Sequence, residues 1–367
     1  MKKTKVGIIG CGNISGIYCK TLKKMAATDL VAVADLLLPR AKGRATEFGI
    51  ARACSVKQLL ADPEIGIVVN LTIPKAHAEV AMQVLKAGKS VYNEKPLAVT
   101  RDQAAAMLKL AAEKKVRIGC APDTFLGAGI QTCRKLIDDG WIGKPVAATA
   151  FMMCRGHEGW HPDPDFYYQP GGGPMFDMGP YYLTALVNLI GPIRRISGSA
   201  RVTFPERVIT SQPKNGTVIK VNTPTHLAGV VDFANGAIGT IVTSFDVVAH
   251  THSCIEIYGT DGSILVPDPN GFGGDVKVKR RGQADWAIVP HTHAYPENSR
   301  GLGVADMAAG IASGRPHRAS GELAAHVLDA MQAFLDASES GKAVILGTTC
   351  NQPAPMPMNL RDGQVEE

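Results

Sequence analysis

Gly7-Ile8-Ile9-Gly10-Cys11-Gly12-Asn13-Ile14-Ser15-Gly16 follows the first apolar run of the chain and decides the fold. The stretch reads G-x-G-x-x-S, with serine where glycine or alanine is commoner. Gly10 would permit a tight turn, and Gly12 would let the backbone approach a pyrophosphate held at the amino end of the following helix. We therefore predict a dinucleotide site here, made by Gly10, Gly12, Asn13 and Ile14.

Short apolar runs alternate with helical segments over the rest of the first third. The strand-like runs are KVGIIG, LVAVAD, IGIVVNL, KSVYN and VRIGC. Nearly continuous apolar strands joined by helices are typical of a parallel sheet that is covered on both faces. One helix is expected over residues 101–114, where Thr100 and Gln103 form a capping-box pattern. The sequence thus predicts an α/β, doubly wound Rossmann domain over residues 1–123.

The second predicted strand ends in Asp35, 25 residues after Gly10. An acidic side chain at this point would hydrogen-bond the adenosine ribose hydroxyls of a dinucleotide. Leu36 follows, and the next arginine is Arg40, so no adjacent side chain is suited to a 2′-phosphate. We expect NAD, with NADP disfavoured. The alternative is a structural glycine turn in another kind of α/β protein.

Glu94-Lys95-Pro96 follows the fourth predicted strand. Doubly wound folds bind ligands at the carboxyl ends of their strands, so Lys95 would lie near the nicotinamide end of the cofactor. Pro96 restricts Lys95 to extended geometry, and the peptide bond between them could be cis. A surface lysine in a loop is the alternative interpretation.

A second chemically suggestive segment runs from Gly171 to Leu186 and begins with three glycines. Asp177 and Tyr181 are four residues apart and would share one face of a helix. Pro180 fits only the first turn of a helix without cost, so we expect this helix to begin near Asp177 and to continue to Ile190. Asp177 could then be no more than an N-cap.

Together these motifs resemble the Gfo/Idh/MocA family, and the likeness spans nearly the whole chain. The resemblance implies that Lys95, Asp177 and Tyr181 meet at the substrate carbon. It also places Glu94, Thr72, Pro74 and His77 near the cofactor, although His77 read alone would be a histidine satisfied at a helix start. Many members have D-x-G-x-H-x-x-D, whereas this chain has Tyr181 and Thr184 at the last two positions. Tyrosine resembles the glucose-fructose oxidoreductase branch, and the missing second acid disfavours an inositol-type site.

The stretch His157-Glu158-Gly159-Trp160-His161 matches the H-E-x-x-H pattern of zinc peptidases. That motif needs a helix, but glycines and prolines surround it here and favour a loop. No third ligand follows at the spacing of those enzymes, so we predict no metal site and retain the peptidase only as a remote alternative. In the family's architecture this loop would line the substrate pocket, which makes Trp160 and His161 candidate substrate contacts.

Residues 124–367 are predicted to form a C-terminal α+β domain for substrate binding and oligomerisation. A helix over 128–139 is followed by successive strands, and Asn235-Gly236 and Asp261-Gly262 are strong hairpin turns. We expect a large, mostly antiparallel, open-faced sheet with one face uncovered in a monomer, which predicts a homodimer or homotetramer. Helices near 301–313 and 321–339 should pack back on the first domain. The proline-rich tail from Gln352 is expected to trail loosely.

Composition limits the classes of protein that the chain can represent. Its 367 residues are 45% hydrophobic and 20% charged, as in ordinary globular proteins. The net charge of +6 is dispersed, and its densest run, Lys277 to Arg281, is expected to be a solvated hairpin edge, not a nucleic-acid site. We expect no membrane partner, because no apolar run approaches ~18 residues. Eight cysteines without a C-x-x-C pair indicate reduced thiols and a cytoplasmic protein.

These observations predict an NAD-dependent dehydrogenase that transfers a hydride between a sugar or sugar-like polyol and nicotinamide. The proton acceptor would be Lys95 or Tyr181, with Asp177 holding the substrate hydroxyl. To act as a base, Lys95 would need its pKa lowered to ~7–8, which burial beside the oxidised nicotinamide could achieve. The alternatives are a trans-dihydrodiol or inositol-type dehydrogenase and a non-catalytic relative that senses NAD or sugar.

Overall fold

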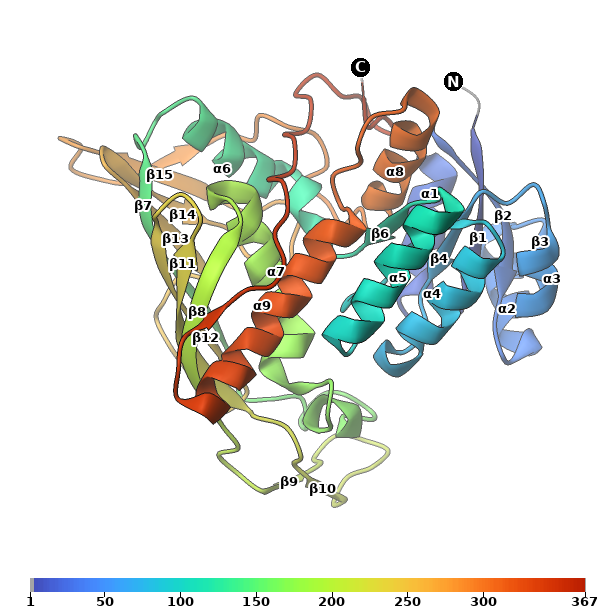
Figure 1. Ribbon diagram of the computed structural model, residues 1–367, viewed down its shortest axis with the longest axis horizontal. Helices are drawn as coiled ribbons and strands as arrows, with labels where there is room; N and C mark the ends of the chain where they lie inside the picture. Colours follow the sequence, from blue (N-terminus) through green and yellow to red (C-terminus); the bar gives the residue numbers. More distant parts are fainter. Residues whose placement is uncertain (1–2, 367) are drawn as a thin grey trace.

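A computed structural model describes residues 3–366 and contains two large sheets joined by long helices, with a separate two-stranded hairpin (Figure 1). The first sheet is parallel, with the strand order β3-β2-β1-β4-β5-β6. Its strands are β1 (Thr4–Ile9), β2 (Thr28–Ala34), β3 (Arg52–Cys54), β4 (Ile67–Asn70), β5 (Ser90–Asn93) and β6 (Ile118–Cys120). The five predicted strands are confirmed. The sequence did not indicate β3, which is only three residues long.

Helices connect these strands and cover both faces of the sheet, with α4 and α5 on one side and α1 on the other (Figure 1). They are α1 (Ser15–Lys24), α2 (Leu38–Phe48), α3 (Val56–Ala61), α4 (His77–Lys86) and α5 (Arg101–Lys114), with a short 3-10 turn η1 (Pro74–Ala76) before α4. The predicted helix over 101–114 is confirmed. Its cap differs slightly from the expected box, because Thr100 Oγ1 accepts from the Gln103 N–H while the Gln103 side chain accepts from Val99.

The second sheet has nine strands in the order β16-β15-β14-β13-β7-β12-β11-β8-β17. They are β7 (Pro145–Met153), β8 (Ile193–Arg201), β11 (His226–Phe233), β12 (Ile238–Ser244), β13 (Ile255–Gly259), β14 (Gly262–Val266), β15 (Val276–Arg280), β16 (Ala287–Val289) and β17 (Val344–Ile345). The predicted hairpins at Asn235-Gly236 and Asp261-Gly262 join β11 to β12 and β13 to β14. The sheet is mostly antiparallel, as predicted, but β7 and β12 pair in parallel.

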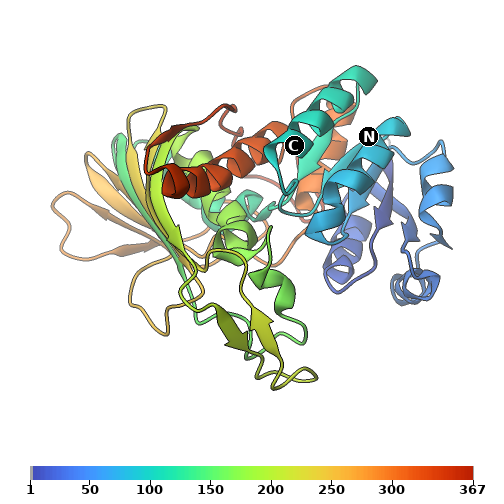
Figure 2. The same ribbon diagram turned by 60° about the horizontal axis from the view of Figure 1, so that its bottom comes forward.

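Helices lie on only one face of this sheet. They are α6 (Ala128–Asp138), α7 (Gly173–Ile190) and α9 (Gly321–Ser340), and no helix among residues 3–366 packs on the other face (Figure 2). α8 (Leu302–Ser313) and the start of α9 instead reach β6 of the first sheet, where Cys120 donates its N–H to the Ala319 carbonyl. The predicted return of these two helices to the first domain is therefore confirmed.

The start of α7 differs from the expectation. The helix begins at Gly173, with Pro174 in its first turn, so that Pro180 lies inside it and Asp177 is not its N-cap. The glycines explain the earlier start: Gly173 has φ +79°, and a Cβ there would lie 2.7 Å from the Pro224 carbonyl oxygen. Pro180 lacks the N–H that would bond four residues back, a cost that the deeply buried helix tolerates.

The C-terminal tail is also unlike its prediction, because it is packed along both domains. Gln352 donates to the Asn188 carbonyl, Met356 donates to Gln131, and the Gly363 carbonyl accepts from Ala26 of the first domain. Prolines remove backbone donors but leave their carbonyls, and arginines occupy them here: Arg134 donates to Pro353 and Arg318 to Pro355. The proline-rich composition therefore produces an ordered strap.

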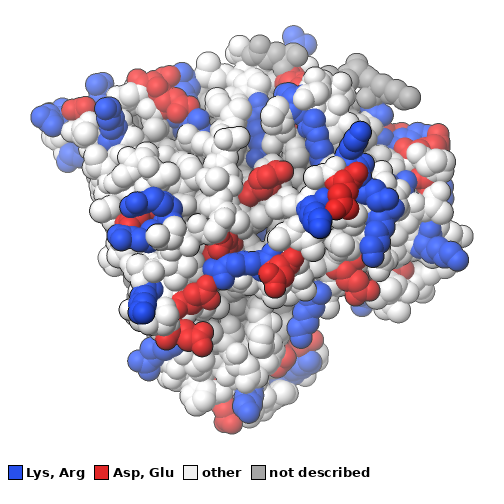
Figure 3. All heavy atoms as spheres, viewed as in Figure 1, with Lys and Arg blue, Asp and Glu red and all other residues white. Residues whose placement is uncertain are grey.

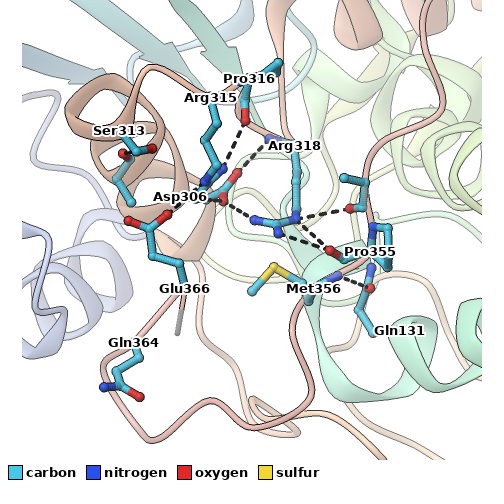
Figure 4. Close-up of polar contacts among 12 residues, drawn as sticks. Gln131, Asp306, Ser313, Arg315, Pro316, Arg318, Pro355, Met356, Gln364 and Glu366 are labelled. Carbon is cyan, nitrogen blue, oxygen red and sulfur yellow. Dashed lines mark hydrogen bonds and ion pairs between the residues drawn. The ribbon is translucent and has the colours of Figure 1, made fainter.

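A buried ion cluster fastens this strap to α8 (Figure 4). The Asp306 carboxylate is fully buried and accepts from Arg315 and Arg318. Arg318 also donates to the tail carbonyls, and Arg315 pairs with Glu366 at 2.8 Å. One carboxylate thus orients two arginines, which in turn hold the last residues of the chain.

The charged side chains and the cysteines can be compared with what the composition predicts. Basic and acidic side chains are interspersed over the face shown in Figure 3, and the densest basic run lies on β15 and the turn after it. All eight cysteines are free, as predicted, and the cytoplasmic location inferred from them stays a prediction. Within residues 3–366, no helix has both the length and the apolar character needed to cross a membrane.

We predict that Arg318→Met lowers the free energy of unfolding by about 3 kcal/mol, because a buried carboxylate would lose one of its two cations. Urea unfolding followed by circular dichroism would measure this change. Arg361→Met, at an exposed position of the same tail, is the matched control and should change the stability by less than about 0.5 kcal/mol. Equal effects of the two variants would contradict the role given to the Asp306 cluster.

Candidate active site

The glycine turn has the conformation that a dinucleotide site needs. Gly10 adopts φ +100°, and a Cβ there would lie 2.7 Å from the Leu71 backbone carbonyl. A Cβ on Gly12 would point into open space, and Gly12, Asn13 and Ile14 are exposed. α1 begins directly after them, so the amino end of this helix lies beside this opening. The turn therefore fits a pyrophosphate, as the sequence predicted.

Asp35 lies directly after β2 and organises the same turn. Its carboxylate accepts from the Cys11 N–H at 2.8 Å and from the Leu37 N–H at 2.9 Å. Leu36 beside it is 94% exposed. The basic side chain that does reach the turn is Arg44, but it donates to the Gly12 carbonyl and pairs with Glu47. This arrangement leaves an acidic, not a basic, environment at the predicted ribose position, as NAD requires.

A buried polar layer holds the loops after β4 and β5 together. The His77 Nδ1 atom is 2.7 Å from the Pro96 carbonyl oxygen, and its Nε2 atom is 3.0 Å from the Thr72 carbonyl oxygen. Thr72 also donates its hydroxyl to Asn70. Burial lowers the pKa of His77, which begins α4. His77 thus supports the Glu94-Lys95-Pro96 loop from behind, while Thr72 and Pro74 line the pocket in front of it.

Glu94 and Lys95 follow β5 and point into the same region. Glu94 accepts from the Tyr18 hydroxyl at 2.7 Å and from the Lys95 N–H at 2.9 Å, which fixes the carboxylate beside α1. The bond between Lys95 and Pro96 is cis. The Lys95 ammonium leaves the first domain and reaches α7.

Lys95 and Asp177 form an ion pair that joins the two domains. The Nζ atom is 2.8 Å from Asp177 Oδ1 and 2.6 Å from the Asp177 carbonyl oxygen. Burial acts to lower the pKa of Lys95, but the negative charge of Asp177 outweighs it, and the pKa is raised above its ordinary value. Burial acts to raise the pKa of Asp177, yet Lys95 and His157 together lower it to about 2. In the protein alone, Lys95 is therefore held protonated and does not have the lowered pKa of a base.

Tyr181 lies one turn after Asp177, between two cations. The Lys95 Nζ atom is 5.1 Å from the centre of its ring, and the Arg300 Cζ atom is 5.9 Å away. Burial raises the pKa of Tyr181, whereas the charges of Lys95 and Arg300 oppose that increase. Neutral oxygens fix Arg300: the side-chain oxygens of Asn270 and Asn298 and the Asn270 carbonyl. Sequence reasoning missed Arg300, because it lies in a loop 119 residues after Tyr181 without a motif of its own.

The H-E-x-x-H segment is a loop with a single turn at its centre, in which the His161 N–H bonds the His157 carbonyl. Glu158 pairs with Arg207 and accepts from Tyr168, so it is engaged in the structure of the loop. Residues 3–366 contain no group of three or more His, Cys, Asp or Glu side chains placed to hold a metal ion. His157 instead reaches the catalytic region, with its Nε2 atom 3.3 Å from Asp177 Oδ2, a role that the sequence did not indicate.

The remaining candidates, Trp160 and His161, do not line the pocket. Two aromatic residues of the same loop, Phe166 and Tyr167, line it in their place, and His161 contacts both rings. The pocket has a volume of about 310 Å³. Its lining consists of Ile14, Thr72, Pro74, His77, Glu94, Lys95, Pro96, Phe166, Tyr167, Gly171, Gly172, Phe176, Asp177 and Tyr181. Thr184 is buried and lies outside this lining.

A parallel Rossmann sheet whose glycine turn opens toward a lysine, an aspartate and a tyrosine defines an NAD-binding oxidoreductase. Comparison with protein families agrees. A model described as "Oxidoreductase family, NAD-binding Rossmann fold" matches residues 4–121, and one described as "GFO/IDH/MocA C-terminal domain" matches residues 130–265. The chain belongs to the Gfo/Idh/MocA family of oxidoreductases.

Characterised relatives are distant. The 1,5-anhydro-D-fructose reductase of Ensifer adhaerens is 26% identical over 71% of this chain and 74% of its own length. The levoglucosan dehydrogenase of Pseudarthrobacter phenanthrenivorans is 25% identical over 72% and 74%. Among solved structures, an NAD-binding oxidoreductase from Klebsiella pneumoniae superposes with a TM-score of 0.82, and a levoglucosan dehydrogenase in complex with NADH with 0.81. Both are 21% identical and cover 94–95% of this chain and 99–100% of theirs, which shows a common fold.

Proposed function

We propose that the protein is an NAD-dependent dehydrogenase that oxidises a carbinol of a sugar or sugar-like polyol, or reduces the corresponding carbonyl. The observation that carries the proposal is the contact of Lys95 with Asp177 beside Tyr181 in one pocket. The names of the relatives support a sugar substrate, since they act on an anhydrofructose and on levoglucosan. A relative that only senses NAD or sugar would not need this buried ion pair.

We assign the cofactor to residues 1–123 and the substrate side of the pocket to residues 124–367. Gly10, Gly12, Asn13, Ile14 and Asp35 would hold NAD at its adenosine and pyrophosphate end. Thr72, Pro74, His77 and Glu94 would hold its other end. When bound, NAD supplies the hydride acceptor at its nicotinamide ring. This division follows from which domain contributes each side chain to the lining.

Tyr181 is the residue that we assign to proton transfer. If Lys95 lost its proton, Asp177 would remain as a buried carboxylate without its cation, which is strongly unfavourable. If Tyr181 lost its proton, the phenolate would lie between the charges of Lys95 and Arg300. In oxidation, the substrate hydroxyl proton passes to the Tyr181 phenolate as the hydride leaves the same carbon. Lys95 and Asp177 then orient the hydroxyl, with His157 fixing the carboxylate from its other side.

A screen of NAD reduction over free sugars, glycosides and polyols would test the proposed function. We expect turnover with at least one carbinol, and we predict that Lys95→Met reduces kcat by about 10²–10³-fold because the substrate hydroxyl loses its oriented cation. Binding of NAD, measured by calorimetry, should persist because the glycine turn is unchanged. Lys75→Met, an exposed lysine before α4, is the matched control and should keep ordinary turnover. Full activity of Lys95→Met would refute the assignment.

The pH dependence should report Tyr181. Because burial raises its pKa above the usual ~10, the phenol is protonated at neutral pH. Reduction uses this proton and should be flat near neutrality, whereas oxidation needs the phenolate and should rise about tenfold per pH unit until the pKa is reached. We predict that Tyr181→Phe removes this rise and lowers kcat. Tyr167→Phe changes another tyrosine of the pocket and should keep the rise of the oxidation rate with pH. If Tyr167→Phe removed this rise as well, the result would argue against the assignment of Tyr181.

We also propose that the uncovered face of the second sheet forms a homodimer or homotetramer. The register places Val230, Ile238, Val242 and Phe151 on this face, and the first two are 40% and 53% exposed. We predict that the double change Val230→Lys and Ile238→Lys yields a monomer in light scattering, because new ammonium groups would be buried in the contact without partners. Leu36→Lys, at an exposed leucine of the first domain, should leave the assembly intact. A monomeric wild-type protein would exclude this interface.

A further inference from the structure

The loop that carries the H-E-x-x-H segment is built as a rigid wall of the pocket. It spans residues 154–171, includes the 3-10 turn η3 (Asp165–Tyr168), and packs against the hairpin of β9 (Glu206–Val208) and β10 (Val218–Lys220). Figures 1 and 2 show this hairpin and the loop side by side, projecting from one end of the second sheet. We call residues 154–171 and 204–222 together the aromatic lobe.

Arg207 is the centre of this lobe. It is buried and pairs with Glu158 of the loop and with Asp246 at the end of β12. Its guanidinium also lies 5.1 Å from the ring centre of Tyr168 and 5.5 Å from that of Phe204. Further bonds join hairpin and loop, from Ser211 to the His161 carbonyl and from Lys214 to Asp163. Buried charges with several partners restrain the segments that they join, here the loop, the hairpin and the residues after β12.

Aromatic rings run without interruption along this wall, from the active site to solvent. The His157 ring, hydrogen-bonded to Asp177, lies 4.1 Å from Tyr167 and 5.2 Å from Trp160. Tyr167 and Phe166 are 4.0 Å apart and nearly aligned, with 32° between their planes. His161 contacts Trp160, Phe166 and Tyr167 and closes the cluster.

Two of these rings are exposed to solvent, although ion pairs hold the aromatic lobe in place. Trp160 is 63% exposed and Phe166 is 48% exposed, and Phe166 also lines the pocket. Held aromatic faces at the rim of a ligand pocket are typical of recognition surfaces, because covering them removes a large apolar area from water. Trp160 and Phe166 therefore extend the ligand-binding surface beyond the pocket, on the side of the second domain.

The volume of the pocket indicates which part of a substrate would cover the exposed rings of Trp160 and Phe166. Its 310 Å³ is at the low end of the ~300–1,000 Å³ usual for ligand sites, and the same space must hold the reacting end of the cofactor. One substrate ring at Lys95, Asp177 and Tyr181 would fill it. A second ring, attached through a glycosidic bond, would emerge at Phe166 and Trp160, where its apolar face could stack.

We propose that Trp160 and Phe166 form an outer subsite for the aglycone ring of a glycoside, so that the preferred substrates are glycosides and not free monosaccharides. This proposal rests on the proposed function and names its substrate class more closely. The inner ring would be oxidised, and the outer ring would contribute binding only.

The test compares the methyl and phenyl glycosides of one sugar that the enzyme oxidises. We expect the wild-type protein to show a kcat/KM about 3- to 10-fold higher for the phenyl glycoside, the range of an aromatic contact. Trp160→Ala and Phe166→Ala should each reduce this ratio toward one. Trp286→Ala, before β16 at the far edge of the second sheet, is the matched control and should keep it. A ratio near one in the wild type, or a ratio unchanged by Trp160→Ala, would overturn the subsite.

A binding measurement separates this proposal from the proposed function. Titration of the protein and NADH with a phenyl thioglycoside should change the tryptophan fluorescence, and Trp160→Phe should abolish that change whether or not turnover occurs. If no carbinol reduces NAD, the dehydrogenase assignment fails. If carbinols are oxidised but the fluorescence change survives in Trp160→Phe, the outer subsite alone is wrong.

Discussion

The ion pair between Lys95 and Asp177 is the contact on which the site depends, because it is where the two domains share a charge. Lys95 belongs to the loop after β5 and Asp177 to the second turn of α7, 82 residues later. Each side chain would be costly to bury alone, and each makes the other's charged form the stable one. The pair therefore fixes the relative position of the cofactor side and the substrate side of the pocket. It also favours the protonated form of Lys95, since the negative charge of Asp177 raises the pKa of that ammonium group.

The sequence was most informative where local patterns and chemistry coincide. The G-x-G turn followed a clear apolar strand, so both its conformation and its place beside Asp35 could be predicted from near neighbours. Lys95, Asp177 and Tyr181 were singled out from short motifs that contain proline and glycine, and the resemblance to the family implied that they meet. The start of α7 was predicted too late for the same reason: Pro180 suggested a first turn, whereas the three preceding glycines let the helix begin at Gly173. The preference of proline for the first helical turn conflicted there with the freedom of the glycines, and burial of the helix determined where it begins.

The rest of the site depends on contacts between distant parts of the chain. Arg300 meets Tyr181 through a loop after β16, and His157 meets Asp177 only because Arg207 holds its loop from the β9–β10 hairpin. Neither contact produces a recognisable residue spacing in the sequence. Trp160 and His161 lie in the predicted loop but outside the pocket lining, which Phe166 and Tyr167 of the same loop join instead.

The course of the C-terminal strap bears on how the chain is made. Val365 is buried, and the Gly363 carbonyl accepts from the Ala26 N–H, so the strap completes part of the surface of the first domain. α8 and α9 likewise cover β6 only after some 300 residues have been made. During synthesis, the β6 edge of the first sheet therefore stays uncovered until α8 and α9 have been made.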